Sequence, residues 1–449
     1  MESRCDAVMQ WQRAARFRRI CPLLKETPDG WRCSVNAQEV RPFWGRALVY
    51  GAATLLGVYL VAGSAVFVTL RLTQHEISYF ALVWPPRWKE IRSSQEKLYA
   101  VRAQQAMAAG RYQEAILSLE MVCRLNPRNY TAGLALASLS QVAANPTVTE
   151  SIYERLLRDV PDQRTQTAQI LFRNLLARSA YDKIKSLAAV MVVEDAGQRG
   201  TWLHALFFAA RQTNDPEVLK KLLEQRSLLP EWCVELVTIE QALLRNRLAE
   251  VAPRLTRVYG LHSAPYVPYY QVDRLLRHGR PDDALNLLGS YGRIIPADEA
   301  AFLQLRVWRA LGWKSLVDSG HEALLLQPMT NRLAAQCCAY LVGNPAPGLL
   351  AGYLEKFNRE APPLSMESLP LYHAMYLAAD VAGNRSGAEN IAGRIKRFTG
   401  TDARVLQGLV QLLATSRKDD RLSRILPLVP LPTEVVYAIL ERQPVAAAK

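Results

Sequence analysis

AVRAQQAMAAGRYQEAILSLEMVCRLNPRN, residues Ala100–Asn129, has the pattern of two helices joined by a tight turn. The small residues Ala103 and Ala106 recur at helical spacing in the first half. Gly110 then interrupts the pattern, as a glycine does between helices. Apolar or small residues line the second half at i, i+4 and i+7, at Ala115, Leu119 and Val122. Pro127 ends the unit because proline cannot continue a helix.

The same spacing returns later in the chain. Pro127 follows the small residue Ala115 after twelve residues. Three further pairs keep this step of twelve residues, at Val218 and Pro230, Ala284 and Pro296, and Leu316 and Pro328. A glycine also precedes the second helix in several units, at Gly110, Gly279, Gly312 and Gly383. Self-similarity at a fixed period indicates a repeat protein.

These units resemble the tetratricopeptide repeat, in which a small residue lets two helices approach and a proline closes the unit. The resemblance covers residues 96–435 as about ten degenerate repeats. It implies an all-α fold, a TPR-like α-solenoid in which helix hairpins form a right-handed superhelix. It also implies a concave face, built by the first helix of each hairpin, that binds proteins or peptide segments. Residues 436–449 are expected to form a C-terminal cap and a frayed tail.

A second pattern precedes the repeats. Residues Ala47–Leu70, ALVYGAATLLGVYLVAGSAVFVTL, contain no charge and are bounded by Arg46 and Arg71. As a helix the segment would be about 36 Å long, enough to cross a hydrocarbon core of about 30 Å. We expect one transmembrane helix that places Ala47–Leu70 in the lipid bilayer. Residues 71–95 follow as a juxtamembrane spacer with tryptophans and prolines.

The charges that flank the span bear on its orientation. Lysine and arginine tie within about twenty residues of either end, three against three. The whole segment 1–46 is short and basic, however, and a large body can cross a membrane largely regardless of its charge. We therefore expect a single-pass protein of the bacterial inner membrane with a cytoplasmic tail and a periplasmic solenoid; the reverse orientation stays open.

The tail also resembles half of a zinc ribbon. Cys21 and Cys33 are its candidate ligands, and Asp29-Gly30-Trp31 has turn character. A structural zinc site takes four tetrahedral ligands. Leu24 stands where the second thiolate of the first knuckle belongs, so we expect a degenerate ribbon that holds no metal.

Charge and motifs argue against several functions. The chain of 449 residues has a net charge of +14, but its cations are scattered, whereas nucleic acid requires them clustered. The sequence has no phosphate-binding loop, no dinucleotide fingerprint, no nucleophile elbow and no zinc-protease motif. We expect a non-catalytic protein without a cofactor, a nucleic-acid partner or a small-molecule substrate.

One cluster stands out as a partner-binding site. Tyr266, Tyr269, Asp273 and Arg277 follow one another at helical spacing, and the repeat register places them on the concave side. Tyrosine and arginine are common anchors of protein interfaces. The sequence thus predicts a membrane-anchored scaffold that binds proteins. Two alternatives stay open: an assembly subunit of a bacterial envelope or export complex, and an enzyme or transmembrane sensor with an unrecognised site.

Overall fold

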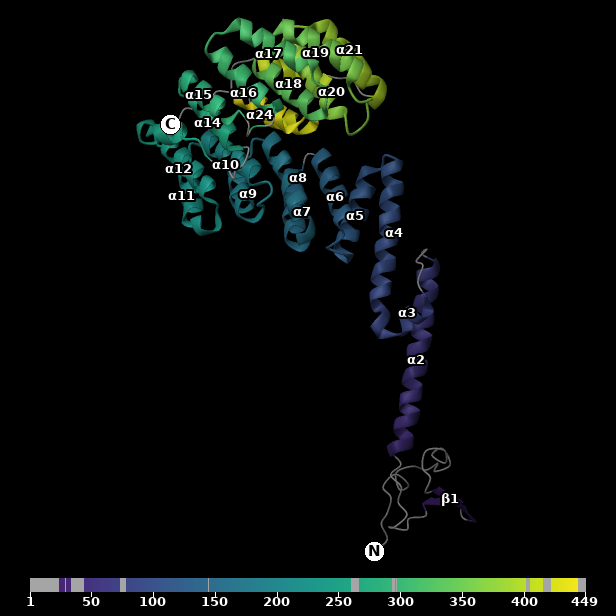
Figure 1. Ribbon diagram of the computed structural model, residues 1–449. Helices are drawn as coiled ribbons and strands as arrows, with labels where there is room; N and C mark the ends of the chain where they lie inside the picture. Colours follow the sequence, from purple (N-terminus) through teal and green to yellow (C-terminus); the bar gives the residue numbers. More distant parts are fainter. Residues whose placement is uncertain are drawn as a thin grey trace. The chain divides into compact units, whose positions relative to one another are not determined.

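The computed structural model describes residues 24–28, 30–33, 44–72, 78–143, 145–259, 266–292, 295, 297–400, 404–414 and 421–442. These residues are helical apart from one two-stranded hairpin, which confirms the predicted helical class (Figure 1). The chain divides into two compact units, Met1–Ile152 and Tyr153–Lys449.

Unit 1 contains the hairpin and the long apolar helix. Strands β1 (Leu24–Thr27) and β2 (Gly30–Cys33) pair antiparallel, with Leu24 opposite Cys33. Helix α2 covers Trp44–Leu72, slightly more than the predicted span. Within it, Leu48–Leu72 is long and apolar enough to cross a membrane, and no other helix in the described part of the chain meets this test.

A short helix returns along α2. Helix α3 (Tyr79–Val83) packs against its second half, where the Tyr59 hydroxyl donates to the Val83 carbonyl at 2.7 Å. The Ser64 and Tyr79 hydroxyls lie 3.0 Å apart in the same contact. The 3-10 turn η2 (Pro85–Arg87) and helix α4 (Trp88–Ala108) follow. Helix α4 thus begins within residues 71–95, for which the sequence predicts a spacer.

The first helix hairpin of unit 1 is built as its spacing predicts. Helix α4 packs along α5 (Tyr112–Leu125), and small residues allow the two backbones to approach closely. The contact buries two small residues of α4 and three small or apolar residues of α5: Ala103, Ala106, Ala115, Leu119 and Val122. Helix α6 (Tyr130–Val142) follows, and α7 (Pro146–Asp159) contains the boundary with unit 2.

Unit 2 consists of α-helices and short 3-10 turns. Its elements are η3 (Pro161–Gln163), α8 (Arg164–Ala177), α9 (Tyr181–Glu194), α10 (Arg199–Thr213), α11 (Glu217–Glu224), η4 (Arg226–Leu228), α12 (Glu231–Leu244), α13 (Leu248–Leu255), α14 (Tyr266–Arg277), α15 (Pro281–Tyr291), α16 (Ala297–Ala310), α17 (Lys314–Leu326), α18 (Asn331–Gly343), α19 (Pro347–Glu360), α20 (Leu369–Val381), α21 (Arg385–Thr399), α22 (Arg404–Ala414), α23 (Leu422–Ile425), η5 (Leu426–Leu428) and α24 (Thr433–Glu441). We call the even-numbered helices α8 to α22 the first helices, and the odd-numbered ones the second helices.

Most of the turns that join the two helices of a hairpin share one backbone geometry. Within the described segments of both units, seven such turns contain a residue in the left-handed region: Gly110, Ser179, Asn214, Asn246, Gly279, Gly312 and Gly383. The next N–H donates to the carbonyl five residues before it, as Arg280 does to Leu275 at 2.9 Å. This is the hydrogen bond of a Schellman C-cap, and it recurs at about 34 residues or twice that interval.

First and second helices differ in how they are buried. Second helices bury one face; α21, for example, buries Ala388, Ile391 and Ile395. The first helices α10 and α20 are buried nearly all round, over Leu203–Ala210 apart from His204 and over Leu371–Ala379. A helix that is apolar on every side needs a cover on every side. Their neighbours along the chain therefore do not account for all of this burial.

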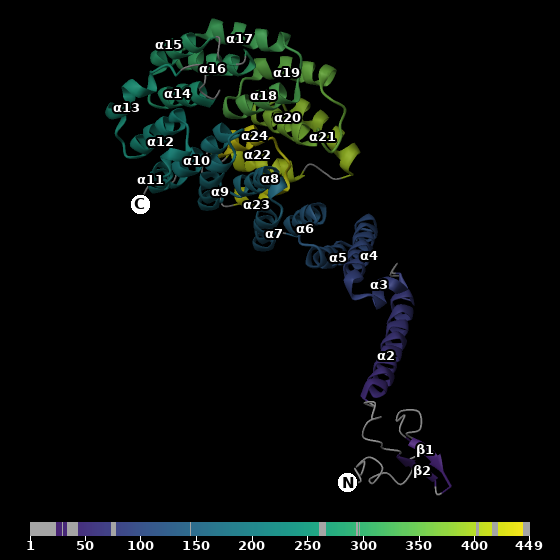
Figure 2. The ribbon, with the colours of Figure 1, turned by 60° about the horizontal axis from the view of Figure 1, so that its bottom comes forward.

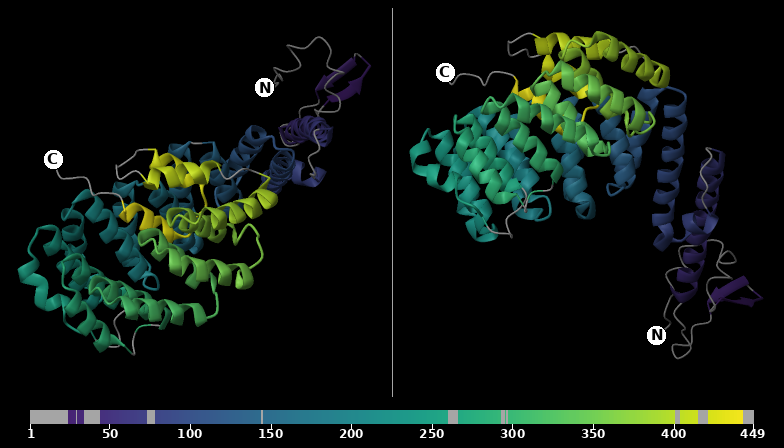
Figure 3. Two further views of the ribbon diagram at one scale, coloured as in Figure 1. Left: turned by 90° about the horizontal axis from the view of Figure 1, so that it is seen from above. Right: turned by 45° about the horizontal axis from the view of Figure 1, so that its top comes forward.

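The C-terminal helix provides part of the cover. Helix α24 folds back and packs against α18 and α8 (Figure 2). In Figure 2 the helices from α9 to α21 follow a curve, and the yellow helices α22 and α24 lie on its inner side. The yellow segment also lies beside the green helices in both views of Figure 3. The sequence predicts a cap over residues 436–449. Helix α24 begins before these residues, at Thr433, and packs on first helices, while residues 443–449 lie outside the described part.

Two glycines of one hairpin test the turn geometry. Gly279 has φ of +69°, whereas Gly289 lies exposed within helix α15, and an added Cβ meets nothing within 4 Å at either site. Gly279→Ala should therefore lower the free energy of unfolding by about 1–2 kcal/mol through backbone strain alone. Gly289→Ala should raise it by about 0.5–1 kcal/mol. Chemical denaturation of both variants measures this, and equal effects would contradict the assigned turn.

Candidate partner-binding site

Helix α14 brings all four predicted residues into one neighbourhood of unit 2. The rings of Tyr266 and Tyr269 stack with their centroids 6.2 Å apart. The guanidinium of Arg277 donates to the carboxylate of Asp273 one turn earlier, at 3.1 Å. Asp273 is buried, whereas Tyr269 keeps 37% of its surface exposed. The four residues thus join a larger cluster whose other members come from distant parts of the sequence.

Asp273 is the centre of this cluster. Its Oδ2 accepts from Arg274 Nη2 at 2.6 Å, and its Oδ1 accepts from Arg306 Nη2 of α16 at 2.5 Å. Arg211 of α10 approaches Oδ2 to 3.7 Å. With Arg277, guanidinium groups from three helices surround a single carboxylate. Charge-assisted hydrogen bonds of this kind are about twice as strong as neutral ones.

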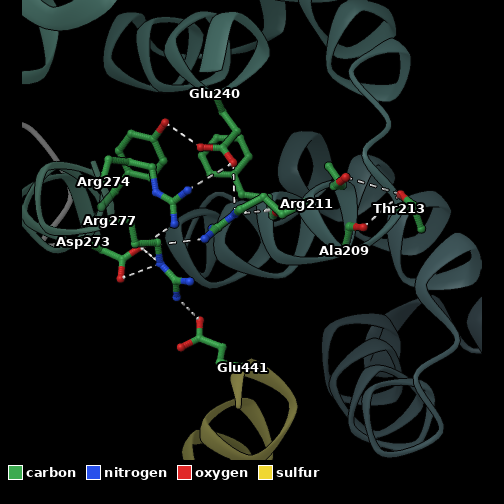
Figure 4. Close-up of polar contacts among 11 residues, drawn as sticks. Ala209, Arg211, Thr213, Glu240, Asp273, Arg274, Arg277 and Glu441 are labelled. Carbon is green, nitrogen blue, oxygen red and sulfur yellow. Dashed lines mark hydrogen bonds and ion pairs between the residues drawn. The ribbon is translucent and has the colours of Figure 1, made fainter. Parts of the chain in front are cut away.

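Glu240 of α12 supplies a second buried carboxylate. It accepts a hydrogen bond from the Tyr270 hydroxyl at 2.8 Å and pairs with Arg211 at 3.0 Å. Figure 4 shows Arg211 between the carboxylates of Glu240 and Asp273. Arg306 of α16 also pairs with Asp273, so α10, α12, α14 and α16 meet in one network. Two buried carboxylates that share several arginines fix the relative positions of these helices more tightly than apolar contact alone.

The C-terminal helix extends the network. Glu441 of α24 pairs with Arg277 Nη2 at 2.7 Å, and Figure 4 shows its carboxylate reaching from the yellow helix to that guanidinium. Arg442 donates to the carbonyl of Val342 in α18 at 2.9 Å. The Pro430 carbonyl lies 3.1 Å from His373 Nδ1 of α20. The C-terminal segment is therefore held at several separate points.

An aromatic group lies next to these charges. The ring of Tyr437 in α24 lies 4.5 Å from His204, 4.8 Å from Phe208 and 6.3 Å from Phe172, between centroids. His204 also contacts Tyr266 and Tyr269 edge-on. Edge-to-face pairs add about 0.5–1.5 kcal/mol each to the free energy of burial. We call the residues Phe172, His204 and Phe208 the aromatic box.

The electrostatics follow from burial and from the arginines. Burial alone would raise the pKa of Asp273, but the guanidinium groups around it, those of Arg274 and Arg306 first, hold its pKa well below the usual range. Burial, reinforced by the charge of Arg211, lowers the pKa of His204 to about 3. At neutral pH the site thus has the ionised carboxylate of Asp273 beside the neutral imidazole of His204.

The sequence prediction named α14 alone and missed the residues that other helices bring to it. These are Arg211, Glu240 and Arg306 of the charge network, together with His204, Tyr437 and Glu441. One available signal was the repeat register. His204, Tyr269 and His373 each lie ten residues before a left-handed turn residue, at Asn214, Gly279 and Gly383. In α10 and α20 the residue at this position, His204 or His373, contacts the C-terminal segment.

The structure offers little for metal chemistry in the residues it describes. No group of three or more metal-binding side chains occurs among them. Cys21 lies outside the described residues, and for Cys33 only the position in β2 is described. Cys337 and Cys338 are buried in α18, and burial raises the pKa of both thiols. Both are therefore protonated, small apolar residues at neutral pH.

No protein-family model matches this sequence, and no curated protein matches it significantly.

The central carboxylate can be tested against a matched surface residue. Asp273→Asn removes the carboxylate to which Arg274 donates at 2.6 Å, leaves that buried guanidinium with Glu240 alone, and should lower the free energy of unfolding by about 3–5 kcal/mol. Asp283→Asn removes a carboxylate that pairs with Arg280 at the surface of the next helix and should cost less than about 1 kcal/mol. Denaturant titration measures both, and similar losses would contradict a buried network.

The histidine in the aromatic box predicts a pH dependence. Between about pH 6.5 and pH 3 the unfolded chain binds a proton at His204 that the folded chain excludes, so stability falls as the pH falls. From pH 7.5 to 4.5 this should cost about 2–3 kcal/mol. His204→Phe should reduce the difference by that amount while other groups titrate equally. Identical pH profiles for the two proteins would rule out this role.

Proposed function

We propose that this chain is a single-pass membrane-anchored scaffold: a TPR-like α-solenoid that binds partner proteins or peptide segments and catalyses no reaction. The observation that carries the proposal is the apolar helix α2. Its central window contains no buried residue, and side chains such as Leu55 and Leu56 expose 73% and 58% of their surface. An apolar surface this large is unfavourable in water and favourable in a bilayer.

The body supports the binding part of the proposal. Six hairpins of unit 2 share one turn geometry, and first helices bring tyrosines and arginines together around α14. Such residues concentrate in interface hot spots. Tyr269 keeps an exposed surface beside Arg306, whose guanidinium lies 6.0 Å from the ring centroid. It offers a partner an aromatic contact next to fixed positive charge.

Membrane insertion is tested by alkaline carbonate extraction. We expect the full chain to stay in the membrane pellet, because each arginine at the centre of a span costs about 2.5–3.5 kcal/mol and α2 has none there. Leu55→Arg combined with Leu56→Arg should release the protein, whereas the matched pair Leu55→Val and Leu56→Val should not. Release of the unaltered protein would overturn the anchor.

Orientation and binding are tested in the same cells. In spheroplasts of a bacterial host, we expect external protease to digest the body, as a periplasmic solenoid requires. A photo-crosslinking residue at Tyr269 should capture discrete proteins, identified by mass spectrometry. The same group at Leu316, an exposed position on the second helix α17, is the control. Equal, diffuse labelling from both positions would contradict a binding site near α14.

A further inference from the structure

The C-terminal segment 430–442 has the contacts of a bound ligand. It touches first helices that lie far apart in the sequence: Tyr437 fills the aromatic box of α8 and α10, and Glu441 pairs with α14. Its ends are held by α20, through Pro430, and by α18, through Arg442. A helix that only extended the stack would pack on the preceding hairpin and would not need contacts with α8, α10 and α14.

The side chains of this segment that contact α8, α10 and α14 lie close together on helix α24. Helix α24 buries the apolar residues Val435, Val436, Ile439 and Leu440. Tyr437 and Glu441 lie one turn apart and so project from the same side of the helix. The aromatic ring enters a box of rings, and the carboxylate one turn later meets a guanidinium. Proteins that bind an amphipathic helix in a groove recognise it through anchor residues at such i and i+4 positions.

The charges around Asp273 require the carboxylate that α24 brings. Four arginines share this network: Arg211, Arg274, Arg277 and Arg306. They contact three carboxylates, and one of these is Glu441. Without α24, four guanidinium groups would remain with two carboxylates. The site therefore favours an anionic occupant, and an unfilled site would be cationic and partly desolvated.

Two hydroxyls show that α24 leaves part of the site unsatisfied. The hydroxyl oxygens of Tyr266 and Tyr437 are buried and make no hydrogen bond within the described part of the chain. A buried polar group without a partner costs about 1–3 kcal/mol. The segment before α24 contains Pro430 and Pro432, which interrupt regular structure and separate this helix from η5. The occupant is thus a short, separate helix whose fit is incomplete.

We propose that residues 430–442 are a built-in ligand, and that a partner protein replaces them with its own amphipathic helix. The partner helix carries an aromatic residue and, one turn later, a carboxylate. It enters the aromatic box and pairs with Arg277, while α24 leaves the inner side of unit 2. This inference rests on the proposed scaffold function and names the kind of partner that the function requires.

A labelled peptide of residues 430–442 tests the proposal by fluorescence anisotropy, with the full chain held in detergent or nanodiscs. In the unaltered protein α24 competes with the peptide. Glu441→Gln in the protein removes one ion pair and keeps the apolar contacts, so it should strengthen peptide binding several-fold. Tyr437→Ala combined with Glu441→Gln should strengthen it at least tenfold. Circular dichroism checks that each variant is folded. If the double variant does not fold, the Glu441→Gln protein alone decides the test.

Matched peptides test the chemistry of recognition. Glu441→Lys in the peptide should abolish binding, whereas Glu434→Lys, a change at an exposed position of the same helix, should leave it unchanged. Arg277→Glu in the protein should restore binding of the Glu441→Lys peptide. Equal affinity for both altered peptides, or no gain in the folded Glu441→Gln protein, would overturn the proposal.

The results also separate this inference from the scaffold function. If the peptide binds as expected but Tyr269 captures no partner in cells, the built-in ligand stands and the scaffold function fails. If partners are captured at Tyr269 but no folded protein binds the peptide, the scaffold stands and the built-in ligand is wrong.

Discussion

The structure of unit 2 depends on one buried carboxylate. Asp273 accepts hydrogen bonds from arginines of α14 and α16 and lies near Arg211 of α10, so helices separated by more than sixty residues of sequence share one anion. A lone buried carboxylate would be too costly to desolvate, and a lone buried arginine equally so. Each charge is tolerated because the others are present. The network therefore sets how the first helices are placed, and it leaves an arginine, Arg277, available to the C-terminal helix.

The helical class and individual hairpins could be predicted from the sequence, because helical periodicity and turn chemistry are local. The pattern around Gly110 predicts the α4–α5 hairpin, and Gly279 ends a first helix where the repeat spacing requires it. The apolar run in α2 is equally local. The site was predicted only for α14, since periodicity reveals one helix at a time. Arg211, Glu240 and Glu441 come close to α14 only through tertiary packing, and no spacing rule links them.

The inner side of unit 2 combines two requirements that usually conflict. Its first helices are apolar enough to need a cover, as the burial of α10 and α20 shows. Its arginines are numerous enough to need carboxylates. Helix α24 meets both requirements with one amphipathic face and Glu441. In our proposal α24 protects a binding surface. The apparent affinity for a partner then depends on how much more tightly the partner's helix binds this surface than α24 does.

The most direct test is hydrogen exchange of the α24 amides in the full chain. A nine-residue helix is too short to be stable alone in water, so protection of Thr433–Glu441 requires that it be bound. We predict that these amides exchange at least about a hundredfold more slowly than those of an unstructured peptide, with less protection than α18. Exchange at the unstructured rate would contradict the account, because the inner side of unit 2 would then be open.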